Sequence, residues 1–288
     1  MRKVILAAFL VVCVCAYPSP NKEVDVAFEE IIFRNIPNIR KQLSNKPITI
    51  SDEEWKDIID ICKPSQPSDG IQDNVNACID KLFSIVDGFI AQNFDPLPLK
   101  DMHAGFNYTL IITYHGELDL TNGKLLGFST LHRTDDAKFD FNIFNLTATV
   151  GVGFGFDQLG FTYDYSAKIM NLGPKGGLEG SVTDLAMNLE VGFDFKNKAL
   201  TLKDFSITNS GNITFKFTGH AIVDWLLNCL TKLITKLMKG LILEVMEDVV
   251  GGAIDALIDA INNYWHKTPL LYDVSEYHKY PIVKFNVA

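Results

Sequence analysis

The sequence predicts an α+β fold in which a strongly curved antiparallel β-sheet wraps around a long C-terminal helix, with extra helices at the N-terminus. Apolar residues recur at helical spacing near both ends of the chain, whereas between Phe106 and Phe217 they alternate with a period of two. The strands of this middle region are long enough that they must bend or coil to enclose a core. The C-terminal apolar arc is wider than a coiled-coil seam and needs contact on two sides, which a surrounding sheet supplies.

The chain begins with the features of a signal peptide. Two basic residues precede an unbroken apolar run that ends at Val14, and the small residue Ala16 suits the position before a cleavage site. The run is too short to span a bilayer. We expect residues 1–16 to be removed and the mature protein to be secreted into the extracellular space.

The composition indicates a globular protein without nucleic-acid partners. Hydrophobic residues make up 47% of the chain, which provides a sizeable core. The formal net charge is −9, and loss of the two basic residues of the signal peptide makes it −11. Non-specific attraction to nucleic acid or to anionic membranes is therefore not expected.

Three cysteines remain in the predicted mature chain. Cys62 and Cys78 flank a loop rich in proline and serine. In an oxidising compartment we expect them to form a disulfide, and closing a loop of that size stabilises a chain by roughly 3 kcal/mol. Cys229 lies in an apolar helical stripe and is expected to be a buried, inert thiol.

Three N-glycosylation sequons agree with secretion. Each has a threonine two residues after the asparagine, and because chance sequons are common we expect one or two to be occupied, at solvent-facing strand or turn positions. The acceptor residues are Asn107, Asn145 and Asn212.

Three helical segments are expected before the strands. The first covers residues 28–43 and is kinked or divided at Pro37. The second begins at the capping box Ser51-Asp52-Glu53-Glu54. The third covers residues 75–90 and ends before Pro96, because proline does not continue a helix.

The strand region contains two phase slips and one stretch with a bare face. The alternation is clearest over residues 185–195, and after a turn at Asn197-Lys198 it reverses near Lys203-Asp204, which an extra bulged residue explains. A second slip follows Ile143 and has the same explanation. In residues 151–155 glycine occupies every second position. Either another part of the chain or a ligand approaches that face, or the strand bends there, and we favour bending.

The C-terminal helix is expected to start near Ile222 and to break at Gly240 and at Gly251-Gly252. Charged residues interrupt every window long enough to cross a bilayer, so stable membrane insertion is not expected. Three lysines share one face, which is either solvated, the interpretation that we favour, or meets an anionic lipid head group. They are Lys232, Lys236 and Lys239.

No pattern in the sequence indicates catalysis or metal binding. The chain lacks the Gly-x-Ser-x-Gly turn of hydrolases, a metal-binding set of histidines and cysteines, and the spacing of a calcium or phosphate loop. His115, in a predicted strand, is interpreted as structural. We therefore expect a protein that is not an enzyme and that has no catalytic residue, no metal site and no cofactor.

Four segments have a recognisable sequence. The longest runs from His115 to Ala137, beginning His-Gly-Glu-Leu-Asp-Leu-Thr-Asn-Gly and ending Arg-Thr-Asp-Asp-Ala. The others are Phe94-Asp95-Pro96, Phe161-Thr162-Tyr163-Asp164-Tyr165 and Leu200-Thr201-Leu202-Lys203-Asp204-Phe205. In this order they resemble the group 7 dust-mite allergens and their insect relatives, over roughly residues 72–263.

The resemblance implies an elongated roll, similar to one half of the bactericidal/permeability-increasing and lipopolysaccharide-binding proteins and to the insect takeout and juvenile-hormone carriers. Members of this wider group carry lipids in an apolar tunnel between sheet and helix. On this basis residues 71–265 form a lipid-binding roll between an N-terminal helical extension, residues 17–70, and a tail, residues 266–288. The two extensions depart from the family pattern. They either cap the roll, cover a tunnel mouth or bind a protein partner.

We predict that the protein binds or transports a hydrophobic, lipid-like molecule in an apolar pocket between sheet and helix. A closed core would use the same residue types as such a pocket. Two alternatives are an extracellular interaction protein with a filled core, which binds its partner through the N-terminal extension, and an innate-immune protein that binds microbial lipid. The candidate ligand-binding residues are Phe139, Phe141, Leu189, Val191, Phe193, Phe215, Trp225, Leu226, Leu233 and Leu237.

Overall fold

A computed structural model of the chain describes residues 26–62, 71–109, 113–169, 173–219 and 224–267. The predicted signal peptide and most of the predicted C-terminal tail lie outside these ranges. The helical elements are α2 (Ile39–Ser44), α3 (Asp52–Cys62), α4 (Ile71–Phe94), η1 (Phe128–Thr130), α5 (Asp224–Met246), the π-helical η2 (Glu247–Gly251) and α6 (Gly252–Lys267). The strands are β1 (Val26–Arg34), β2 (Leu97–Pro98), β3 (Asp101–Thr109), β4 (Thr113–Leu126), β5 (Leu131–Arg133), β6 (Lys138–Asn142), β7 (Thr147–Ile169), β8 (Lys175–Asp194) and β9 (Ala199–Gly219).

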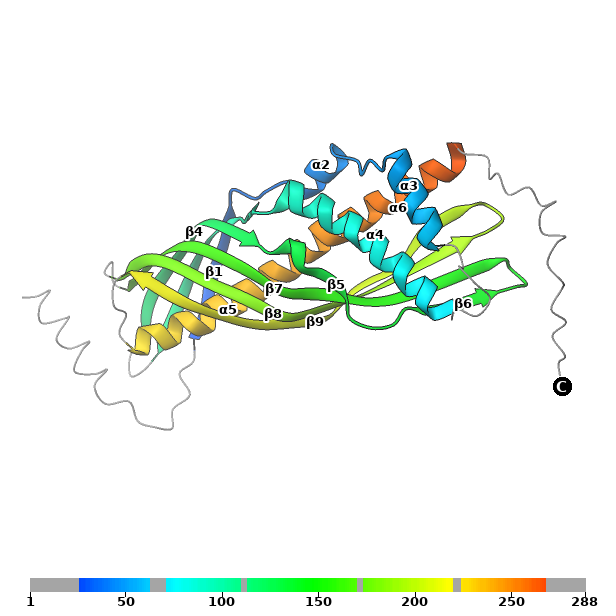
Figure 1. Ribbon diagram of the computed structural model, residues 1–288. Helices are drawn as coiled ribbons and strands as arrows, with labels where there is room; N and C mark the ends of the chain where they lie inside the picture. Colours follow the sequence, from blue (N-terminus) through cyan, green and yellow to red (C-terminus); the bar gives the residue numbers. More distant parts are fainter. Residues whose placement is uncertain (1–25, 63–70, 110–112, 170–172, 220–223, 268–288) are drawn as a thin grey trace, which may run out of the picture.

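The strands of the described ranges form one nine-stranded sheet. Its main path is β1-β3-β4-β7-β8-β9, and all neighbours on that path are antiparallel. The two-residue β2 pairs with β4, while the short β5 and β6 both pair with β7. Figure 1 shows the long strands extending through the length of the folded body. The predicted α+β class with a long antiparallel sheet is confirmed, and β1 and β9 are the edges of the main path.

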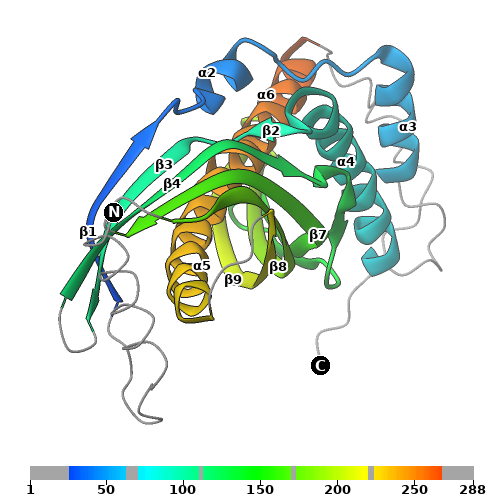
Figure 2. The same cartoon turned by 90° about the vertical axis from the view of Figure 1, so that its left-hand side faces the viewer.

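The elements α5, η2 and α6 follow one another as a continuous helical rod that packs against the sheet. α5 contacts both edge strands, β1 and β9, and α6 contacts β9 as well. In Figure 2, β3 and β4 lie above α5 while β8 and β9 lie beside it. Leu230, Ile234 and Met238 of α5 are fully buried. The wide apolar arc of the sequence is therefore the face by which the rod enters the core.

The buried residue Lys100 ties the rod to the sheet. Its side-chain nitrogen Nζ donates a hydrogen bond of 2.5 Å to the carboxylate of Glu244 in α5, and it lies 3.9 Å from the centre of the Phe33 ring in β1. The hydroxyl of Tyr163 in β7 donates to the backbone carbonyl oxygen of Lys100 at 3.0 Å. A buried charge needs such partners, and for the ammonium group of Lys100 they come from α5 and β1, while the Tyr163 hydroxyl holds its backbone carbonyl.

The expected first helix is wrong over its first half. Residues 26–34 form β1, which pairs with β3, and only Ile39–Ser44 is helical. The register of this pairing shifts between Phe28 and Glu30, so that an extra residue interrupts the two-residue alternation of the strand. The apolar residues consequently recur at a spacing that imitates a helix.

Two further expectations are corrected. The phase slip after Ile143 is a turn between β6 and β7, and no bulge is needed there. The helix continues through Gly240, where an added Cβ would meet nothing within 4 Å. At Gly251-Gly252 it passes from the π-helical η2 into α6 without ending. Glycine costs helix stability without forcing a break, and burial of the rod outweighs that cost.

Other local signals are confirmed. The β8–β9 register passes from Asp204 to Leu202, so Lys203 is the bulged residue. At the capping box, the backbone N–H of Ser51 donates to the Glu54 carboxylate at 2.8 Å, and the N–H of Glu54 donates to the Ser51 hydroxyl at 3.2 Å. α4 ends at Phe94, before the proline that was expected to stop it.

Another part of the chain packs against the face of β7 on which the glycines of residues 151–155 lie. The backbone N–H of Thr134 donates to the carbonyl oxygen of Gly153 at 2.9 Å, and a Cβ added at Gly153 would come within 2.7 Å of the Thr134 hydroxyl. A Cβ at Gly155 would collide with the carbonyl oxygen of Leu185 in β8. At Gly151 the nearest atom would be 4.0 Å away. Close approach of other residues, the alternative to bending, therefore explains two of the three glycines.

Substitution of these glycines tests that explanation. Gly155→Ala is expected to lower the free energy of unfolding by roughly 1–3 kcal/mol, because the methyl group meets a backbone carbonyl held in the β7–β8 ladder. Gly151→Ala in the same strand is the matched control and is expected to stay within about 0.5 kcal/mol of the wild type. Urea unfolding followed by circular dichroism measures both. Equal losses for the two variants would contradict the steric explanation.

Candidate functional site

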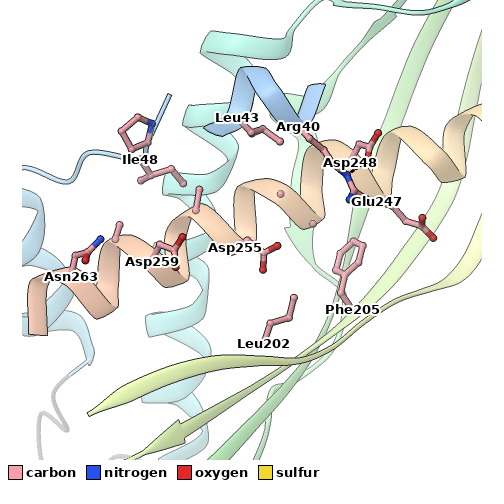
Figure 3. Close-up of a pocket in the computed structure, with 15 residues that line it drawn as sticks. Arg40, Leu43, Ile48, Leu202, Phe205, Glu247, Asp248, Asp255, Asp259 and Asn263 are labelled. Atoms are coloured by element: carbon pink, nitrogen blue, oxygen red, sulfur yellow. Dashed lines mark hydrogen bonds and ion pairs between the residues drawn. The ribbon is translucent and has the colours of Figure 1, made fainter. Parts of the chain in front are cut away.

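A pocket lies between the edge strand β9 and the junction of η2 with α6 (Figure 3). Its volume is about 510 Å³, within the range of small-molecule sites. Leu202 and Phe205 of β9 face the rod across this space, and Asp255 of α6 points toward them. Leu43 of α2 and Ile48, in the segment after it, line a third side. Three parts of the chain that are distant in sequence thus meet here.

The rod contributes a row of small residues to the pocket lining, and at Gly252 this row faces α2, because a Cβ added there would come to 2.5 Å from the Leu43 side chain. Gly252, Ala256 and Ala260 lie four residues apart, which places them in one row on the helix surface. Gly251 precedes this row, and a Cβ added there would come to 3.5 Å from the Phe205 ring, an ordinary contact. Because this row lines the pocket, larger side chains in it would reduce the volume of the pocket.

A second pocket continues along β9. Its volume is about 490 Å³, and it is lined by residues 205–208 and Ser210 of the strand together with Leu243 and Glu247 of the rod. Phe205 and Glu247 line both pockets, so the two spaces adjoin. We call the pair the β9 groove.

Carboxylates dominate the charge of the larger pocket. The Nε of Arg40 donates to Asp248 Oδ1 at 2.7 Å, and the lining also includes Glu247, Asp255 and Asp259. Burial raises the pKa of the Asp255 carboxyl above its ordinary value, and the neighbouring Asp259 raises it further, while Arg40 acts in the opposite direction. Negative charge is therefore concentrated on one side of an otherwise apolar space.

The functional groups in the lining of the larger pocket are carboxylates, one guanidinium and one carboxamide. Of the lining residues of the larger pocket, none is a serine, cysteine, histidine or lysine. Within the described ranges, no group of three or more His, Cys, Asp or Glu side chains is placed to hold a metal ion. The helices in those ranges include none that is long and apolar enough to cross a membrane.

The ten predicted ligand-binding residues lie outside the β9 groove. Four are buried in the hydrophobic core, three are half-buried on the sheet and two are exposed, while the side chain of Trp225 is not among those described. As ligand contacts they stay predictions. The buried residues are Leu189, Leu226, Leu233 and Leu237, the half-buried ones are Val191, Phe193 and Phe215, and the exposed ones are Phe139 and Phe141.

The two exposed phenylalanines belong to a larger apolar surface at the ends of β6, β7 and β8, which we call the aromatic end. Phe144, in the β6–β7 turn, is 91% exposed. The rings of Phe141 and Phe195 lie 5.6 Å apart, and the N–H of Phe195 donates to the carbonyl oxygen of Leu146 at 3.0 Å, so the two hairpin ends are joined. The aromatic end consists of Phe139, Phe141, Ile143, Phe144, Leu146 and Phe195.

The sequon asparagines differ in exposure. Asn145 lies in the β6–β7 turn and Asn212 lies on β9, and both are exposed. Asn107 is half-buried in β3, between β1 and β4. A glycan needs room outside the sheet, so Asn145 and Asn212 are the better placed acceptors.

The three cysteines have the expected states. Cys62 and Cys78 are joined by a disulfide. Cys229 is a free thiol, 2% exposed, in α5. Burial raises the pKa of this thiol to about 12, with Lys232 acting weakly in the opposite direction. A thiol that is both protonated and covered is inert.

None of the residues that line the β9 groove was predicted from the sequence as a ligand-binding residue. Phe205 follows the bulged Lys203, and this change of phase turns it toward the rod. Ala256 and Ala260 alternate with Asp255 and Asp259 along α6. A row of small residues beside a row of carboxylates on an otherwise apolar helix was the available signal.

One protein family and two solved structures are similar to this chain. Residues 74–261 match the family model described as Group 7 allergen. None of the curated proteins compared with the chain matches it. Among solved structures, Takeout 1 of Epiphyas postvittana is similar over 69% of this chain and 94% of that chain, at 18% identity and a TM-score of 0.34. A lipopolysaccharide binding protein is similar over 62% of this chain and only 35% of its own length, at 12% identity and a TM-score of 0.35.

The state of Cys229 can be measured directly. The native protein is expected not to react with iodoacetamide over hours at pH 8, because the thiol is covered and its pKa is about 12. Unfolding in guanidinium without reductant is expected to release one reactive thiol per chain, which mass spectrometry counts. Rapid alkylation of the native protein would contradict the buried position of α5.

Proposed function

We propose, from the premise that the chain belongs to the group 7 allergen family, that it is a secreted protein which binds a hydrophobic molecule between its sheet and its helical rod. In this proposal the sheet forms a curved roll around the rod, and the ligand enters along the edge strand β9. The protein acts by holding and releasing its ligand, without changing it chemically.

The β9 groove is the observation that carries this proposal. Leu202, Phe205 and Ile207 line the groove from the strand, and the small residues of α6 belong to the lining of the larger pocket. Burial of apolar surface stabilises a bound molecule by about 25 cal/mol per Å². The contacts of α5 with both β1 and β9 support the roll, because a flat sheet would not bring its two edges to one helix.

Secretion is supported by three independent features. The Cys62–Cys78 disulfide suits an oxidising compartment. Asn145 and Asn212 lie at exposed positions, where a glycan can be attached. The N-terminal sixteen residues have the pattern of a signal peptide.

Ligand binding is tested with protein purified from its natural source and with recombinant protein. Native mass spectrometry and organic extraction are expected to recover a hydrophobic molecule, and a fluorescent fatty-acid or terpenoid probe is expected to bind. Ala256→Leu is expected to weaken probe binding at least about tenfold, because the larger side chain fills the groove.

A matched control separates loss of the groove from a general effect of added leucine. Ala77→Leu places the same change on an exposed position of α4 and is expected to bind the probe like the wild type. If Ala256→Leu binds as tightly as the control, the ligand lies elsewhere. If no molecule is extracted and no probe binds, the proposed function is wrong.

The aromatic end favours a second candidate, an extracellular interaction protein. Six large apolar side chains exposed together are more than a monomeric surface ordinarily carries. Phe144 at 91% exposure contributes nothing to the fold that would explain its presence. Asn145 is its neighbour in the turn, so a glycan at that sequon would stand beside the surface and compete with a partner for it.

Photocrosslinking tests this candidate. A photoreactive phenylalanine analogue in place of Phe144 is expected to capture a protein partner from the extracellular fluid of the source tissue, and Phe141→Ser is expected to reduce that capture at least about threefold because it removes part of the same surface. The analogue in place of Glu53, exposed on α3, serves as the control. Equal capture from both positions, or none from residue 144, would remove the aromatic end as an interaction site.

A further inference from the structure

The charge of the larger pocket narrows the class of molecule that the β9 groove accepts. We propose that the pocket selects amphiphiles with a positively charged head, such as long-chain amines, over amphiphiles with a carboxylate head. The proposal rests on the proposed function, because it assumes that the groove binds the apolar chain of the molecule.

The pocket separates its apolar wall from its acidic side. Leu202 and Phe205 project from β9, so an alkyl chain that lies along the strand contacts both. Asp255 and Asp259 stand four residues apart on α6, which places their side chains on one helix face, roughly 6 Å apart at Cβ. Asp255 points into the space between helix and strand. The head of a molecule seated against the strand therefore lies beside this pair of carboxylates.

Arg40 is the basic side chain in the pocket lining, and it acts on Asp255 only at long range. Its ion pair is with Asp248, seven residues before Asp255 on the rod. Among the described residues, no ion pair joins a lysine or arginine to Asp255 or Asp259. The larger pocket has four carboxylates and a single guanidinium in its lining.

The two carboxylates favour a positively charged head group over a negatively charged one. Asp255 and Asp259 are both exposed at the rim of the pocket, so water and salt partly screen their interaction with a nearby charge. Burial is the first cause of the raised pKa of Asp255, and the negative charge of Asp259 is the second. A cationic head relieves the crowding of negative charge, whereas a carboxylate head adds to it.

Three probes with the same dodecyl chain separate the charge from the chain. Dodecylamine, dodecanol and dodecanoate are titrated against a bound fluorescent probe at neutral pH, each below the concentration at which it forms micelles. The amine is expected to bind most tightly and the carboxylate least, with at least about a tenfold difference between them at low salt. The difference is expected to shrink at high salt, because ions screen partly exposed charges.

Charge-removing variants identify the residues responsible. In the double variant Asp255→Asn with Asp259→Asn, the affinity for dodecylamine is expected to fall about three- to tenfold, while that for dodecanol stays within about twofold. Asp57→Asn, which removes an exposed carboxylate of α3, is the control and is expected to change neither. Thermal melting checks that the variants are folded.

The outcomes distinguish this proposal from the one on which it rests. If none of the three probes binds, groove binding and head-group selection both fail. If dodecanoate binds as tightly as dodecylamine, or if the double variant weakens all three probes equally, selection of a cationic head is wrong while binding of an apolar chain in the groove stands.

Discussion

The helical rod has to bury apolar side chains over nearly half of its circumference, and a single flat layer cannot cover an arc of that width. Contacts of α5 with both edge strands meet this requirement, and Lys100 fixes the rod against β1 and β7. The long strands of the sheet also match the rod in length. At 1.5 Å per residue the rod is about 66 Å long, and the 20-residue β8, at 3.3 Å per residue, spans about the same distance.

The change of period along the chain predicted both the sheet and the rod, because each is a regular element with one covered face. Local signals were equally informative where a short-range interaction decides the outcome, as in the Ser51–Glu54 capping box and the bulge at Lys203. β1 was missed for a different reason. Its strand conformation depends on pairing with β3, 67 to 82 residues later, and the bulge after Phe28 hides its alternation.

The site was harder to predict than the fold because a cavity is produced by side chains that are absent. Gly251 and Gly252 were interpreted as a helix break, whereas they lie within the rod and line the pocket, Gly251 beside Phe205 and Gly252 beside Leu43. Alternation of apolar and polar residues along a strand also indicates that one face of the sheet is covered. It does not indicate at which residue the covering elements end. Phe139 and Phe141 continue the apolar pattern of the strand region into an exposed part of the sheet, outside the β9 groove, and as ligand contacts they stay predictions.

The π-helical segment η2 affects the rotation of α6 about the rod axis relative to α5. A π turn accommodates one residue more than an α turn, and one residue corresponds to a rotation of about 100° around the helix axis. The face that α6 turns toward β9 is therefore not the continuation of the apolar stripe of α5. This offset brings Gly251, Asp255 and Asp259 to the edge of the sheet, where a rod without it would present another column of side chains. A change in the number of residues in η2 would therefore alter which side chains of α6 line the groove.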